Sequence, residues 1–78
     1  MKLTLYSMST CPYCIKVLDE MDNIQLNGNI KVLDISDNKN MKDLVSLTGD
    51  YQVPCLVIDG KPMLESDDII KFLRATFD

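Results

Sequence analysis

The spacing of hydrophobic residues changes several times along the chain, and each change marks a predicted element. Leu3 and Leu5 alternate with polar residues across positions 2–6, which is the two-residue period of a strand. From Pro12 onward the spacing becomes helical. The apolar residues with this spacing are Ile15, Val17, Leu18, Met21 and Ile24 or Leu26. A strand is therefore predicted before a helix that Asn27-Gly28-Asn29 ends.

The middle of the chain repeats this strand-then-helix pattern. Apolar residues gather in positions 30–35, which predicts a second short strand with Ile30, Val32, Leu33 and Ile35. A helical stripe follows, and we expect Gly49-Asp50 to end it. The stripe consists of Met41, Leu44, Val45 and Leu47.

The last third predicts a hairpin and a final helix. Residues 56–58 form a continuous apolar run, which is typical of a strand buried on both faces. Asp59-Gly60 is a two-residue hairpin turn, and residues 61–65 are the expected return strand. Ser66 is the expected N-cap of the last helix. The predicted buried face of that helix is Ile69, Ile70, Leu73 and Phe77.

The predicted order is β-α-β-α-β-β-α, which places the chain in the α/β class. The strand-helix-strand opening implies a right-handed crossover between parallel strands, and the later hairpin adds an antiparallel pair. The expected architecture is a four-stranded mixed sheet with three helices. With 78 residues, of which 46% are hydrophobic, the chain is expected to form one domain over residues 1–78.

Composition narrows the possible functions. Twelve acidic and eight basic residues give a net charge of −4, which disfavours nucleic acid as a partner. No apolar run approaches the roughly 18 residues of a membrane span, and the N-terminus has no signal-peptide pattern. Three cysteines, an odd number, do not suit a framework of structural disulfides. We therefore expect a cytoplasmic monomer that uses neither nucleic acid nor a membrane as partner.

The sequence Cys11-Pro12-Tyr13-Cys14 places two thiols at the start of the first predicted helix. Pro12 suits the first helical position, and the free N–H groups and helix dipole there favour a thiolate at Cys11. Cys14 lies one turn further along and is expected to be buried and protonated. The pair therefore predicts thiol–disulfide exchange, with Cys11 as nucleophile and Cys14 as resolving thiol.

Two other uses of this pair remain open. A structural zinc site needs four ligands, but only Cys55 remains and the chain has no His, so no metal site is predicted. A structural disulfide between Cys11 and Cys14 would close a very short loop and stabilise little. Cys55 itself, at the start of an apolar strand, is expected to be a small buried hydrophobic residue.

Three motifs resemble those of the glutaredoxins: Cys11-Pro12-Tyr13-Cys14, Gln52-Val53-Pro54 and Glu65-Ser66-Asp67. The resemblance implies a thioredoxin-like fold, a cis-proline at Pro54 and a dithiol enzyme without a tightly bound cofactor. Its co-substrate would be glutathione, and its substrates protein disulfides or protein–glutathione mixed disulfides. Among relatives of this family an iron–sulfur cluster shared by two chains is also known, so a cluster carrier or sensor is an alternative.

The resemblance also implies a glutathione site. Its residues would be Tyr13, Gln52, Val53, Pro54, Glu65, Ser66 and Asp67. The backbone of Val53 would pair with the cysteinyl part of the peptide, and the last helix would meet the γ-glutamyl end. The alternative is that Ser66 and Asp67 only cap that helix.

The glutathione site and the turn before the last helix depart from the glutaredoxin pattern. Met8 stands where glutaredoxins commonly carry a lysine, and no basic residue lies between Asp43 and Val53-Pro54, so we expect weaker glutathione binding. This motivates an alternative electron donor, a thioredoxin-reductase-type flavoenzyme. Leu64-Glu65 replaces a common Gly-Gly, and Glu65-Ser66 is similar to the N-terminal domain of glutathione transferases. Lys16 is expected to point away from Cys11 around the helix.

Overall fold

The computed structural model describes residues 1–26 and 28–77, and over this range the hydrophobic pattern becomes a four-stranded sheet with three helices. The strands are β1 (Leu3–Ser7), β2 (Lys31–Asp34), β3 (Cys55–Ile58) and β4 (Lys61–Met63). The helices are α1 (Pro12–Asn23), α2 (Asn38–Thr48) and α3 (Ser66–Phe77). This order confirms the predicted β-α-β-α-β-β-α arrangement. No helix in the described part of the chain is long and apolar enough to cross a membrane.

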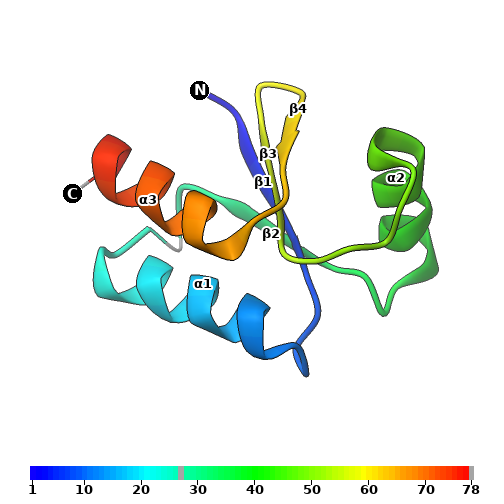
Figure 1. The fold of residues 1–78 in the computed structure, drawn as a ribbon, viewed down its shortest axis with the longest axis horizontal. Coiled ribbons are helices and arrows are strands. Elements are labelled where there is room, and N and C mark those ends of the chain that lie inside the picture. Colours follow the sequence, from blue (N-terminus) through cyan, green and yellow to red (C-terminus); the bar gives the residue numbers. More distant parts are fainter. Residues whose placement is uncertain (27, 78) are drawn as a thin grey trace.

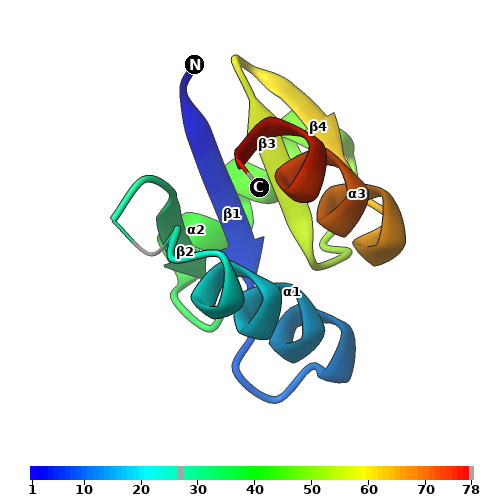
Figure 2. The same cartoon turned by 90° about the vertical axis from the view of Figure 1, so that its left-hand side faces the viewer.

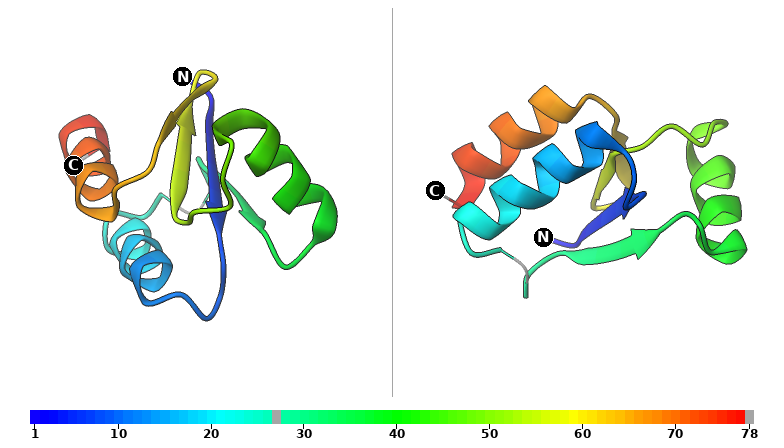
Figure 3. Two further views of the ribbon diagram at one scale, coloured as in Figure 1. Left: turned by 45° about the vertical axis from the view of Figure 1, so that its right-hand side comes forward. Right: turned by 90° about the horizontal axis from the view of Figure 1, so that it is seen from below.

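The sheet is mixed, with the strand order β2-β1-β3-β4. β1 and β2 are parallel, as the crossover through α1 predicts, and β1 with β3 and β3 with β4 are antiparallel. Helices α1 and α3 cover one face of the sheet, and α2 lies on the other (Figures 1 and 3). The carboxyl ends of β1 and β4 lie at the same end of the sheet, so α1 and α3 both begin there.

Alternation along β1 divides the core between the two faces. Leu3 and Leu5 point to the α1 and α3 side, while Tyr6 belongs to the α2 side. The buried residues on the first side are Leu3, Leu5, Val17, Met21, Leu26, Ile30, Leu56, Ile69, Ile70 and Leu73. Those on the second side are Tyr6, Ile35, Leu44 and Cys55. The larger hydrophobic cluster therefore holds α1 and α3 together against the sheet.

The predicted turns occur where expected. Gly49 ends α2 with φ of 81°, a left-handed conformation that glycine adopts without a Cβ penalty. Asp59 and Gly60 connect β3 to β4 with φ of 49° and 89°, the pair of positive values that a tight hairpin turn requires. These turns set the register that brings β4 and α3 back to the end of β1.

Helix α1 ends earlier than its apolar pattern predicted. Its last residue is Asn23, and Gln25 adopts a left-handed conformation with φ of 59°, which stops the helix. Leu26 is nevertheless buried, because the loop folds it back into the core. Asn27, part of the predicted stop, lies outside the described residues.

Five further expectations were wrong in detail. β4 ends at Met63, so residues 64 and 65 belong to the connection rather than to the strand. Ser66 is the first residue of α3 and not its N-cap, because the N–H of Ile69 donates to the carbonyl of Glu65 at 2.9 Å. Phe77, the last residue of α3, is 37% exposed, and Ile15 is 44% exposed on the solvent side of α1. Residues 57 and 58 of β3 are only partly buried.

Candidate active site

Cys11 stands between the end of β1 and the first turn of α1. Figure 2 shows the loop that connects these two elements. It is the N-cap of α1 with an extended backbone, and Pro12 follows at the first helical position. Its N–H donates to the carbonyl of Met8, and its own carbonyl accepts from Ile15, each at 3.0 Å. The thiol is therefore held at a helix N-terminus by the backbone on both sides.

The environment of Cys11 favours its thiolate. Burial raises the pKa of this half-buried thiol, but hydrogen bonds from the Cys14 backbone, the Cys14 thiol and the Tyr13 backbone together lower the pKa below its ordinary value. These donors belong to the first turn of α1, where backbone N–H groups have no helical partner. A lowered pKa increases the fraction of the Cys11 thiol that is ionised at neutral pH.

Cys14 has the opposite environment. It is fully buried, and desolvation is the largest of the effects that raise the pKa of its thiol to about 11, against an opposing hydrogen bond with the backbone of Met8. The neighbouring Cys11 raises this pKa further. Both thiols are free in this structure. The two thiols of the motif therefore differ in pKa, one lowered and one raised.

The segment that precedes β3 approaches Cys11. The Val53–Pro54 peptide bond is cis, as the resemblance implied for Pro54. The Sγ of Cys11 lies 4.0 Å from the carbonyl oxygen of Val53, the limit of a weak S–H···O contact. Cys55 follows directly, and it is fully buried with its pKa raised by desolvation, which confirms the prediction of a small core residue.

A cavity of about 230 Å³ lies next to Cys11. Its lining residues are Tyr13, Gln52, Val53, Pro54, Leu64, Glu65 and Ser66. The structure thus gathers six of the seven residues that the sequence proposed for glutathione, from three separate segments of the chain. Leu64 was missed; the only signal in the sequence was its position beside Glu65.

Asp67 is the predicted site residue that does not line this cavity. Its carboxylate oxygen Oδ1 accepts a hydrogen bond from the Lys16 ammonium at 2.8 Å, and this ion pair lowers the pKa of Asp67 below its ordinary value. Lys16 therefore reaches across from α1 to α3.

The lining of the cavity contains one ionisable acid, Glu65, and no lysine or arginine. Met8, at the position where glutaredoxins commonly carry lysine, packs against the hydrophobic cluster on the α2 side. Among the described residues there is also no group of three or more His, Cys, Asp or Glu side chains arranged to hold a metal ion. The observed features of the site are two thiols, backbone groups and a small, weakly acidic cavity.

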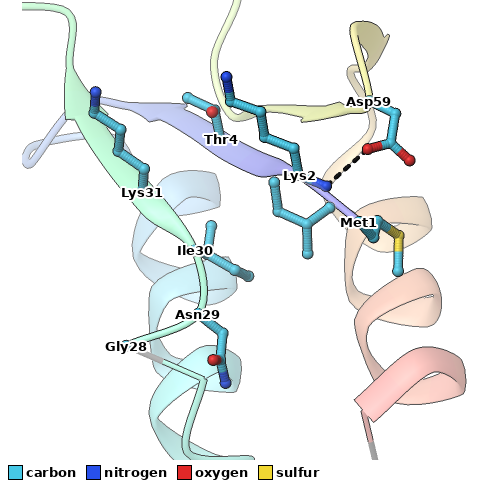
Figure 4. Close-up of a pocket in the computed structure, with 9 residues that line it drawn as sticks. Met1, Lys2, Thr4, Gly28, Asn29, Ile30, Lys31 and Asp59 are labelled. Atoms are coloured by element: carbon cyan, nitrogen blue, oxygen red, sulfur yellow. Dashed lines mark hydrogen bonds between the residues drawn. The ribbon is translucent and has the colours of Figure 1, made fainter.

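A larger cavity of about 750 Å³ lies at the opposite end of the sheet (Figure 4). It is lined by the start of β1, the loop before β2 and the hairpin residue Asp59, whose Oδ1 accepts from the N–H of Lys2 at 2.7 Å. Lys2 and Lys31 point along its walls. Its lining residues lie at the end of the sheet opposite the one where Cys11 follows β1.

Comparison with known proteins identifies the family. The family model described as "Glutathione S-transferase, N-terminal domain" matches residues 5–78, almost the whole chain. A search of curated proteins gave no match.

Solved structures include transferases and glutaredoxins with the same fold. Glutathione S-transferase unclassified 2 from Bombyx mori is 18% identical with a TM-score of 0.82, covering 99% of this chain and 36% of that protein. The glutaredoxin from Archaeoglobus fulgidus is 23% identical with a TM-score of 0.73, covering 94% and 86% of the two chains. The buckwheat glutaredoxin–glutathione complex is 25% identical with a TM-score of 0.66, covering 94% and 68%.

These similarities confirm the thioredoxin-like fold that the motifs implied. The chain spans little more than a third of the silkworm transferases, 38% and 36% of their length. It spans most of the archaeal glutaredoxin.

Proposed function

The chain belongs to the glutathione S-transferase N-terminal domain family, and from this premise we propose that it is a glutathione-linked thiol–disulfide oxidoreductase. The observation that carries the proposal is the contrast between the two thiols at the start of α1. Cys11 has a lowered pKa, and the buried Cys14 has a pKa of about 11. Family and fold support a glutathione-related redox or transferase function, and the dithiol favours redox chemistry.

The reaction proceeds in two exchanges. The Cys11 thiolate attacks one sulfur of a substrate disulfide, forming a mixed disulfide and releasing the other sulfur as a thiolate that takes up a proton. For a protein disulfide, Cys14 then loses its proton and attacks Cys11, which releases the second substrate thiol and leaves the Cys11–Cys14 disulfide. Two molecules of glutathione reduce that disulfide and leave as glutathione disulfide.

The cavity beside Cys11 is the proposed glutathione site. Val53 precedes the first paired residue of β3, so its backbone offers an edge to the cysteinyl part of the peptide. The γ-glutamyl group lies at the start of α3, where the free N–H groups of the first turn suit its carboxylate and Glu65 suits its ammonium. A glutathionylated protein bound there transfers its glutathione to Cys11.

One observation favours an electron donor other than glutathione. The cavity lining has no cation to meet the carboxylates of glutathione. A charge-assisted hydrogen bond contributes roughly 1.5–3 kcal/mol, against about 1 kcal/mol for a neutral one. The alternative is therefore a dithiol carrier that a thioredoxin-reductase-type flavoenzyme reduces.

The test compares electron donors in one assay. NADPH oxidation is followed while the protein reduces a small glutathione mixed disulfide, once with glutathione and glutathione reductase and once with thioredoxin reductase. Cys11→Ser is the blank. Turnover in the first arm supports the glutathione-linked function, and turnover only in the second supports the alternative.

Two further measurements test the two remaining alternatives, an iron–sulfur cluster protein and a glutathione transferase. No turnover in either arm contradicts the oxidoreductase, and anaerobic absorption spectra then test for an iron–sulfur cluster. Conjugation of glutathione to an electrophile without any disulfide reduction would place the activity with the transferases.

A further inference from the structure

The start of α3, which adjoins the proposed glutathione cavity, carries an excess of negative charge. Glu65 lines the cavity, and Asp67 and Asp68 follow on the first turn of α3. Glutathione itself has a net charge of −1 at neutral pH, with two carboxylates and one ammonium. An anionic ligand that approaches three carboxylates is repelled unless a cation offsets them.

Lys16 forms an ion pair with the acidic start of α3. Its ammonium binds Asp67 at 2.8 Å, with the side chains 56% and 74% exposed. Lys71 also acts on Asp67, but its effect on the pKa of that carboxyl is the smallest of those identified. The charge balance at the start of α3 therefore depends mainly on one lysine from another helix.

Both residues of the Lys16–Asp67 ion pair lie near residues that line the cavity. Tyr13 lines the cavity from α1, and Lys16 lies one helical turn further along the same side of that helix. Ser66 lines the cavity from α3, and Asp67 is the next residue. The Lys16–Asp67 pair thus connects α1 and α3 at residues close to Tyr13 and Ser66, which line the cavity.

We propose that Lys16 is a positioning residue that sets the charge preference of the cavity. By holding and neutralising Asp67, it allows the α-carboxylate of the γ-glutamyl group to lie at the start of α3. This inference rests on the proposed glutathione site and extends it to a residue outside the cavity lining.

The expected effect of Lys16→Gln is weaker glutathione binding. Because the pair is exposed, the dissociation constant of the reduced protein for glutathione should rise by about two- to fivefold at low ionic strength. Calorimetric titration with glutathione measures this dissociation constant. The increase should be larger for a glutathione analogue that lacks the α-amino group, since that ligand carries one more net negative charge.

Two observations separate this charge effect from a structural one. The increase should shrink in 0.5 M NaCl, where the Debye length is only a few ångströms, whereas loosened packing would persist in salt. Lys16→Gln/Asp67→Asn should bind glutathione more tightly than Lys16→Gln alone, because the second change removes the uncompensated carboxylate. Lys42→Gln is the matched control, with the same loss of charge on α2.

The outcomes are distinct. Unchanged or tighter binding of glutathione by Lys16→Gln overturns the inference while leaving the proposed function intact; tighter binding would mean that Lys16 withholds Asp67 from the ligand ammonium. A wild-type protein that binds no glutathione contradicts the glutathione-linked function itself, and the inference falls with it. An equal effect of Lys42→Gln would assign the change to net charge rather than to position.

Discussion

At one end of the sheet a cavity of about 750 Å³ lies between the start of β1 and the loop before β2, and at the other end a cavity of about 230 Å³ lies beside Cys11. The large cavity is walled by Lys2 and Lys31, whose ammonium groups are surface charges. The small one is walled by backbone, a cis-proline and the beginnings of two helices.

The two thiols therefore lie at the end of the sheet with the smaller of these two cavities. α1 and α3 both begin at the end with the small cavity, so their unpaired N–H groups and the positive ends of their dipoles converge there. A thiol at that end is shifted toward its thiolate. The opposite end receives the carboxyl end of α1, where the dipole is negative and no thiol is present.

The largest contrast predicted is in thiol reactivity at neutral pH. A pKa of about 11 leaves roughly one Cys14 thiol in 10⁴ ionised at pH 7, whereas the lowered pKa of Cys11 leaves a much larger fraction of that thiol ionised. Iodoacetamide should therefore modify Cys11 faster than Cys14 by on the order of 10²-fold or more, as mass spectrometry of digested protein measures.

The pH dependence of that reaction has a definite sign. Because the pKa of Cys11 is lowered, its alkylation rate should rise with pH and reach its plateau at a lower pH than that of free cysteine. A midpoint at or above the ordinary 8.5 would contradict the role assigned to the start of α1.

A smaller effect is expected when the resolving thiol is removed. Cys14→Ser should slow reduction of a protein disulfide on the order of 10²-fold, because a positioned intramolecular attack is replaced by an encounter with a second thiol. Reduction of a glutathione mixed disulfide should survive, since glutathione itself resolves it. Coupled NADPH assays measure both, with Cys55→Ala as the control. Equal loss of both activities would contradict the division of roles between Cys11 and Cys14.

The smallest effect is expected at the large cavity. Lys31→Gln removes a charge from its wall at the far end of the sheet, beyond the range over which salt leaves exposed charges unscreened. The KM for glutathione should change by less than about twofold at physiological salt. A larger change would mean that net charge, and not the location of Lys16, governs binding at the dithiol end.

Much of the fold could be predicted because its signals are local. The two-residue period in β1, the helical spacing after Pro12 and the positive-φ turn at Asp59-Gly60 depend only on neighbouring residues. The thiol pair at a helix start, with one thiol half-buried and the other fully buried, follows from the same local reasoning.

Local signals did not predict where α1 ends and where α3 begins, because the connecting segments set these boundaries. The end of α1 depends on Gln25, a residue type with no marked preference for the left-handed conformation that it adopts. Ser66 became the first residue of α3 rather than its cap because the connection from β4 reaches the helix through Glu65.

The sequence by itself determined the order of the elements, the two thiols and the residue types available around them. The tertiary structure decided which of those residues meet. Packing of α1 against α3 brings Lys16 to Asp67, and pairing of β1 with β3 brings Val53 to Cys11. These partners are far apart in the chain, and hydrophobic burial and strand register, rather than any motif, hold them in contact.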